Sequence, residues 1–358
     1  MTGIRSTLVA LAVAVAGVQL NPVTAAGFVD VLDTPAQESA LASKGLLQAV
    51  TRAGDSLVAV GQRGHIVVSN DGGAKWTQGK VPVASDLTSV YFVGDKKGWA
   101  VGHDGVILNT TDGGATWTLQ LDGRKANDLL LASLERKAAA EPASEAVKAA
   151  LVEAKRYIEQ GADKPFLDVW FSDENTGYAV GAYNLIFHTR DGGKTWDSWF
   201  DRTENPKFFN LYAIRPAAGT LFIAGEGGLV LKLDASGERF TAVPTPYKGS
   251  YFGVADAKSA VVVFGLRGNV YRTEDAGKAW AKVETGLTAA VVGGATSAKG
   301  ELLLADAGGR IVASEDGGKT YQKVAVKNPL PIFGLTDAGN GRLALVGPRG
   351  VAVAEPTK

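Results

Sequence analysis

The sequence contains no cysteine, which excludes disulfide bonds, cysteine metal ligands, thiolate catalysis and a lipid-modified amino-terminal cysteine. Histidine is also scarce: His65, His103 and His188 are the only three, and their spacing does not suit a metal ion. Basic and acidic residues both number 37, so no excess charge favours nucleic acid or anionic membranes as partners. P-loop, GxSxG and dinucleotide-binding motifs are missing as well. We therefore expect no metal and no cofactor, and a fold held by core packing alone.

The only long apolar run lies at the amino terminus. Arg5 precedes it, the run extends from Leu8 to Leu20, Asn21-Pro22 ends it, and small residues lead up to Ala26. This is the layout of a secretory signal peptide, and the run is shorter than the roughly 20 residues of a membrane span. We predict a signal peptide over 1–26 and a soluble mature chain over 27–358, exported to the periplasm or a similar lumen.

One short stretch recurs along the chain. It reads TTDGGATW at 110–117, and its aspartate falls at Asp71, Asp112, Asp191, Asp275 and Asp316. The spacing of the first pair and of the last pair gives a period of about 41 residues. One wider interval hides a degenerate copy, KLDASGERF at 232–240, and the other contains an insertion.

A second repeated element, which we call the marker turn, precedes these copies. Its seven occurrences are VGQRG at 60–64, VGHDG at 101–105, VGAYN at 180–184, AGEGG at 224–228, FGLRG at 264–268, ADAGG at 305–309 and VGPRG at 346–350. Each unit contains four short segments rich in Val, Ile, Trp and Tyr; in the second unit they are LTSVYFV, WAVG, GVILNT and TWTLQL. Seven such units predict an all-β, seven-bladed propeller. We expect FVDVLDTP at 28–35 to be the strand that completes and closes the last blade.

The repeated aspartate is open to a catalytic and a structural interpretation. The pattern S/T-x-D-x-G-x-T-W resembles the Asp-box of the bacterial neuraminidase repeat, in which the box is a structural turn. Its tryptophans here are Trp76, Trp117, Trp196 and Trp280. Residues repeated in separate blades cannot converge on one substrate, so we favour the structural interpretation and predict no catalytic residue. A glycan-binding or sialidase-like Asp-box protein remains the alternative.

The opposite face of the disc carries the marker turns and the blade-to-blade connections, and there the sequence does not repeat. Residues of about 122–164 form an insertion between blades two and three that predicts a helical hairpin. Its apolar stripes are Leu130, Leu134 and Ala138 in one helix, and Val147, Leu151, Ala154 and Ile158 in the other. Candidate partner contacts on this face are Arg63, His103, Tyr183, Trp199, Phe200, Arg267 and Arg349. Ordinary solvated turn charges are the alternative for the arginines.

The seven units, with VGHDGVILNTTDGGATW at 101–117 as the most specific segment, resemble the photosystem II stability/assembly factor family. The resemblance implies a non-catalytic propeller that binds a membrane-protein intermediate through an arginine-bearing face, here Arg63, Arg267 and Arg349. Two features depart from the family: the lipid-anchoring cysteine is absent, and the helical insertion is foreign to the photosynthetic type. We therefore expect a periplasmic relative whose partner is a membrane-protein complex, either of the photosynthetic kind or another, such as a transporter.

Overall fold

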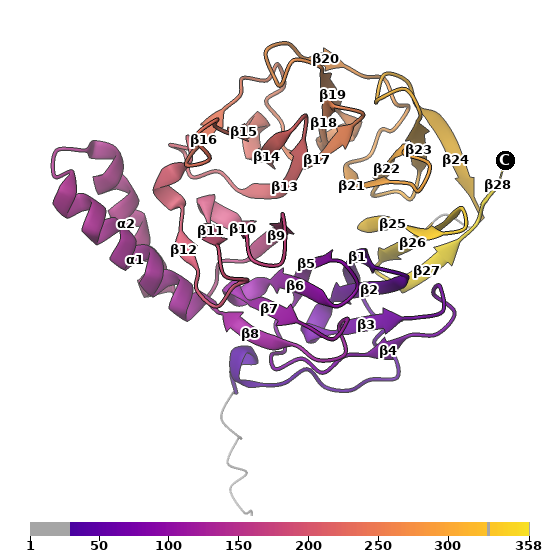
Figure 1. Cartoon of the computed structure of the whole chain (residues 1–358), viewed down its shortest axis with the longest axis horizontal. Helices are drawn as coiled ribbons and strands as arrows, with labels where there is room; N and C mark the ends of the chain where they lie inside the picture. The colour runs from indigo at the N-terminus through magenta and orange to yellow at the C-terminus, as the bar shows by residue number, and fades with distance from the viewer. Residues whose placement is uncertain (1–28, 328–329, 358) are drawn as a thin grey trace, which may run out of the picture.

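Seven antiparallel sheets stand around a central axis in the computed structural model, which describes residues 29–327 and 330–357 (Figure 1). This confirms the predicted propeller. The predicted signal peptide lies outside the described residues and stays a prediction.

The first four blades account for β1 to β16. Blade one contains β1 (Leu47–Ala53), β2 (Ser56–Gly61), β3 (Ile66–Ser69) and β4 (Thr77–Gln78). Blade two contains β5 (Leu87–Val93), β6 (Lys97–Gly102), β7 (Ile107–Thr110) and β8 (Thr118–Leu121). Blade three contains β9 (Phe166–Phe171), β10 (Gly177–Gly181), β11 (Ile186–Thr189) and β12 (Asp197–Ser198). Blade four contains β13 (Leu211–Ala217), β14 (Thr220–Gly225), β15 (Val230–Leu233) and β16 (Phe240–Ala242).

The remaining strands form three blades of unequal size. Blade five contains β17 (Tyr251–Ala257), β18 (Ala260–Gly265), β19 (Val270–Thr273) and β20 (Ala281–Lys282). Blade six contains β21 (Val291–Thr296), β22 (Leu302–Asp306), β23 (Ile311–Ser314) and β24 (Gln322–Val326), and it gains β28 (Pro356–Thr357) as a fifth strand. Blade seven has three strands in the part of the chain that the structure describes: β25 (Gly334–Gly339), β26 (Arg342–Gly347) and β27 (Gly350–Ala354).

The second strand of each blade explains the valine-rich sequence. In β18, AVVVFG, all six residues are buried because the neighbouring blades cover both faces of the sheet. Side chains from adjacent blades interdigitate between the sheets; for example, the rings of Trp99 in blade two and Phe171 in blade three stack with their centroids 3.4 Å apart. The core is therefore a series of interfaces between blades, one of which also includes the helices.

The prediction that residues 28–35 close the ring as a strand is wrong. Val31–Asp33 form a single 3-10 turn, for which the Asp30 side chain accepts a hydrogen bond from Leu32 N at 2.9 Å. This segment lies beside the helical insertion, because Asp30 and Asp33 both pair with Arg124 at 2.9 Å. Long-range ion pairs of this kind have no signature in the local sequence.

The ring closes instead by side-chain packing between blades one and seven. Leu47 and Leu57 of blade one share a buried cluster with Ala344 and Val346 of blade seven. Within the described residues, a single main-chain hydrogen bond joins β27 to the amino-terminal segment, from Val351 N to Ser43 O at 3.0 Å. Among the described residues, the two ends of the chain therefore do not share a four-stranded sheet.

The insertion forms two helices, as predicted. Helix α1 (Gly123–Ala140) and helix α2 (Glu145–Gln160) pack against each other at the rim beside blade three (Figure 1). Asp122 and Ser144 cap their first turns by accepting hydrogen bonds from main-chain N–H groups. The buried face of α2 is Val147, Ala150, Ala154 and Tyr157, so Ile158, which is 39% exposed, does not belong to it.

Candidate docking face

The repeated aspartates are fully engaged inside their own turns. Asp112 accepts hydrogen bonds from Thr116 N at 2.9 Å and from Thr116 Oγ1 at 2.6 Å. Thr110 Oγ1 donates to Asp112 at 2.8 Å and accepts from Gly114 N at 3.1 Å, while Trp117 Nε1 donates to Gly114 O at 3.0 Å. These contacts fold the turn and leave no carboxylate aimed at a substrate.

The same bonds recur in the other copies. Asp71, Asp191, Asp275 and Asp316 each accept from a main-chain N–H of the turn at 2.9 Å. Hydrogen bonds donated by Thr320 lower the pKa of Asp316 below its usual value, so the carboxylate stays ionised. The degenerate copy keeps a reduced version, in which Asp234 accepts from Ser236 Oγ at 2.7 Å.

The marker turns lie on the face that carries the blade-to-blade connections. Gln62 N donates to Leu46 O at 3.1 Å, His103 N to Asp86 O at 2.8 Å, and Leu266 N to Ser250 O at 3.0 Å. In each case the acceptor belongs to the connection that precedes the first strand of the same blade. The variable turns and the connections therefore form one continuous surface.

The residue at the tip of these turns has a strained backbone. Arg63, Tyr183 and Arg267 have φ values of 55°, 51° and 58°. In blade four the same position is Gly227, the residue type that this conformation favours. A residue with a side chain pays roughly 1 kcal/mol or more for the left-handed region. The chain therefore holds large side chains outward where glycine would suit the fold better.

The arginines of this face are free to bind. Arg63, Arg267 and Arg349 are exposed, and none has a carboxylate within 4.0 Å among the described residues. Arg63 is fixed through its main chain, because its N–H donates to Asp86 at 2.7 Å. Tyr183 is tied in the same way to Asn210 at 2.8 Å. Their backbones are thus held while the side chains remain available.

The helical hairpin is joined to this face at its base. A Cβ on Gly105, in the marker turn of blade two, would lie 2.6 Å from the Cα of Gly123 at the start of α1. At the other end, Tyr157 Oη donates to Tyr183 O at 3.0 Å, which links α2 to the marker turn of blade three. The hairpin therefore extends the surface of exposed Tyr183 and His103.

Trp199 and Phe200, two of the candidate partner contacts predicted from the sequence, lie inside the fold, and both side chains are only 3% exposed. Phe200 packs edge-on against Tyr157 of the hairpin, and Trp199 packs against Tyr178 and Phe240 of blades three and four. Phe200 therefore supports the hairpin, whereas Trp199 belongs to the interface between blades three and four. The missed signal was Tyr157, a large side chain in α2 that needs an apolar surface on the propeller.

Two of the three histidines are packed in the core. His188 is 3% exposed and lies between Tyr178 and Trp199, with ring centroids 4.4 and 4.7 Å away. Burial lowers its pKa to about 4, so it is neutral at physiological pH. His65 is 7% exposed, whereas His103 is exposed. Within the described residues no group of three His, Asp or Glu suits a metal ion.

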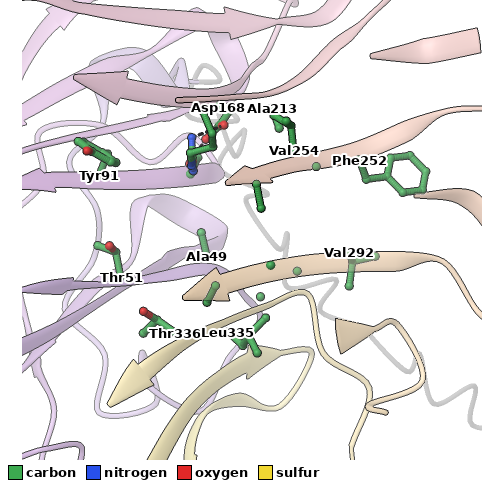
Figure 2. Close-up of a pocket in the computed structure, with 18 of the residues that line it drawn as sticks. Ala49, Thr51, Tyr91, Asp168, Ala213, Phe252, Val254, Val292, Leu335 and Thr336 are labelled. Carbon is green, nitrogen blue, oxygen red and sulfur yellow. Dashed lines mark hydrogen bonds and ion pairs between the residues drawn. The ribbon is translucent and has the colours of Figure 1, made fainter. Parts of the chain in front are cut away.

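The central channel is the other place where chemistry could occur, and its cavity measures about 520 Å³ (Figure 2). Asp168 points into it and accepts from Ser89 Oγ and Ile214 N, both at 2.8 Å. Arg215 is the only arginine that lines the cavity in the described chain, and it pairs with Asp168 at 2.5 Å. The channel therefore lacks the three arginines that a sialidase needs for its substrate carboxylate.

These features define a seven-bladed propeller of the Asp-box class, with repeated turns on one face and variable turns on the other. Sequence comparison is more specific. The chain belongs to the family described as photosynthesis system II assembly factor YCF48, whose sequence profile matches residues 15–111, 74–140 and 147–309.

Individual relatives are distant. The photosystem II assembly lipoprotein Ycf48 of Synechococcus sp. (strain CC9902) is 30% identical over 132 residues, which are 35% of this chain and 38% of that protein. The structure of YCF48 bound to D1 peptide superposes with a TM-score of 0.62 at 17% identity, over 88% of this chain and 95% of that one. A streptogramin B lyase has a TM-score of 0.65 at 11% identity, over the same shares. These two likenesses establish the fold alone, and one of the folds carries an enzyme.

Proposed function

We propose that this protein is an exported, non-catalytic propeller that docks on a membrane-protein complex as an assembly or accessory factor. The docking surface is the marker-turn face, with Arg63, Arg267 and Arg349, the exposed His103 and Tyr183, and the helical hairpin at its rim. In a photosynthetic host the complex is photosystem II; in another host it is a different membrane complex, such as a transporter.

The observation that carries this proposal is the pair of strained, unpaired arginines at turn tips. Backbone strain persists where function requires a particular side chain, and Arg63 and Arg267 hold this conformation without any ion pair among the described residues. Arginine recognises carboxylates through a planar fork of donors. The family's name and the relative solved with a D1 peptide support a membrane protein as the source of those carboxylates.

The chain's own geometry supports docking from the aqueous side. Within the described residues, no helix combines the length and the apolar character that crossing a bilayer requires. The Ycf48 of Synechococcus is named a lipoprotein, whereas this chain has no cysteine to carry a lipid.

Capture from detergent-solubilised membranes of the source cell tests the proposal. Replacing Arg63, Arg267 and Arg349 together by Gln should reduce recovery of the membrane complex at least tenfold. The matched control replaces Lys75, Lys194 and Lys278 by Gln, which removes the same charge from exposed residues of the Asp-turns on the opposite face. Equal recovery by both variants, or turnover of a sialoside by the wild-type protein, would contradict the proposal.

A further inference from the structure

Blade seven lacks the fourth strand that every other blade has, which leaves one edge of β27 without a strand partner among the described residues. Val351 N points to this edge, since it donates to Ser43 O. Along a strand of an antiparallel sheet, successive residues direct their main-chain N–H and C=O groups to opposite edges. Val353, two residues after Val351, therefore directs its N–H and C=O to the same outer edge as Val351. Neither group of Val353 has a hydrogen-bond partner in the described chain.

Side-chain sites lie on both sides of this edge. Towards blade six there is a cavity of about 440 Å³, lined in part by Val326, Leu345, Ala352 and Ala354. Towards blade one, Val351 and Val353 pack against the same buried cluster as Trp76 of the first Asp-turn. A strand placed outside β27 would direct alternate side chains into the cavity and against Trp76, which is how added strands gain specificity.

The charges around the edge select an orientation. Lys44 and Arg349 are exposed at the start of β27, where a Cβ on Gly350 would lie 2.6 Å from the Cα of Lys44. Glu355 follows the other end of the strand. An added strand antiparallel to β27, as in the other blades, would end beside the two cations. Acidic residues therefore fit at the carboxyl end of the occupant.

We propose that the open edge of β27 takes up an extended segment of the partner polypeptide as the missing fourth strand of blade seven, with acidic residues towards the segment's carboxyl end. The inference rests on the docking role proposed above, and it adds the chemistry of the partner segment. It also assigns Arg349 a role that Arg267, on blade five, does not share.

The described residues, 29–327 and 330–357, do not supply this strand. The described amino-terminal segment starts beside Arg124, and it contacts the main chain of β27 only at Ser43, where it makes a turn. The carboxyl-terminal residues leave β27 and pair with β24 as strand β28. A second copy is a poorer fit than a single extended segment, because its own β27 carries the same flanking segments. These would compete for the space that an added strand occupies.

Binding of a synthetic peptide to the purified protein tests the inference. The probe alternates valine with threonine and ends in a run of glutamates; a control peptide has the glutamates at its amino end. We expect the probe at saturation to slow amide exchange of Val353 at least tenfold by nuclear magnetic resonance. The control peptide should bind at least tenfold more weakly.

Protein variants separate this site from the rest of the face. Arg349→Glu should weaken the probe at least tenfold, whereas Arg267→Glu, in the equivalent turn of blade five, should change its affinity less than twofold. Val353→Pro removes the outward N–H and should abolish binding while the thermal transition stays cooperative.

Three outcomes would overturn the inference: no saturable binding of the probe, binding without slower exchange at Val353, or equal effects of the two arginine variants. If exchange of Val353 slows when the protein concentration rises and no peptide is present, a second copy of the chain occupies the edge, and the inference is also overturned. If the probe fails while the marker-turn variants still lose the membrane complex, this inference fails and the docking role stands. If the probe binds as expected while the marker-turn variants still capture the membrane complex, the docking face is refuted and the strand site at β27 is not.

Discussion

At the scale of single residues, Arg63, Tyr183 and Arg267 occupy a backbone conformation that Gly227 occupies in blade four. The sequence gives the position of each turn but not its φ angle, because FGLRG and AGEGG are equally compatible with several turn types. The structure adds that a side chain at the tip residue destabilises the turn, because this residue has a positive φ. Stability and docking should therefore respond in opposite directions to a change there.

Arg267→Gly should raise the free energy of unfolding by up to about 1 kcal/mol, because it relieves the left-handed strain. The same variant should capture less of the membrane complex, because a binding side chain is lost. Urea unfolding and membrane capture measure the two effects. Arg349→Gly is the control: its φ is not positive, so it should gain no stability.

His188 predicts how stability depends on pH. Its pKa is lowered from 6.5 to about 4, first by burial and then by Arg190 and Arg202. The unfolded chain therefore takes up a proton near pH 6.5 and the folded chain only near pH 4. This contribution to stability is complete above pH 6.5 and is lost as the pH falls to 4, at a cost of roughly 3 kcal/mol.

His188→Phe should remove most of that loss, so the free energy of unfolding between pH 6.5 and 4 becomes flatter. Urea unfolding at several pH values in this window measures it. His103→Phe is the control, because His103 is exposed in a turn. An unchanged slope in the His188 variant would show that the histidine is not buried as a neutral ring.

Thr110 tests the structural role of the repeated turn. Its hydroxyl is buried and bonds both Asp112 and Gly114. Thr110→Val should lower the free energy of unfolding by about 2 kcal/mol, because it leaves polar groups of the turn unpaired. Thr111→Val, at the exposed neighbour, should have little effect. Capture of the membrane complex should not change in either variant; a loss in the Thr110 variant alone would place function in the Asp-turn.

At the scale of elements, the sequence predicted most of what is found. Strand β5 has the predicted bounds, 87–93, and the hairpin lies within 122–164 as two capped helices. These elements are predictable because each has a local signal: alternation, turn glycines, or a helical period between caps. Phe200 was misplaced because its burial depends on Tyr157, about 40 residues earlier in the chain. Trp199 was misplaced because it packs against Tyr178 and Phe240 of two different blades.

The hairpin can be removed in a way that leaves the ring intact. Its two ends meet, since a Cβ on Gly123 would lie 2.9 Å from the Cα of Ala162. Joining these ends directly deletes α1 and α2 and exposes Phe200, so a Phe200→Ser change should accompany the deletion. We expect a cooperative thermal transition and reduced capture of the membrane complex, measured by calorimetry and pull-down. Undiminished capture would exclude the hairpin from the docking surface.

At the scale of the whole molecule, the number of blades was predictable and the closure was not. The FVDVLDTP segment has the composition of a strand, but Leu32 is buried in the cluster between blades one and two, and Ala84 N donates to Val31 O at 2.9 Å. Asp30 and Asp33 also pair with Arg124, so the segment lies beside blade two. The carboxyl-terminal residues join blade six instead of blade seven. Such choices depend on tertiary contacts that no local pattern encodes. As a result, the described ring has one incomplete blade, in which the third strand, β27, forms the outer edge.

The central claim is that the marker-turn face, and not the Asp-turn face, meets the membrane complex. Amide hydrogen exchange of the captured complex tests it most directly, because it reports on every turn of both faces at once. We predict slower exchange around Arg63, Tyr183 and Arg267 and at the base of the hairpin, with no change at the Asp-turns around Asp71, Asp191 and Asp275. Slower exchange confined to the Asp-turns, or none on either face, would contradict the account.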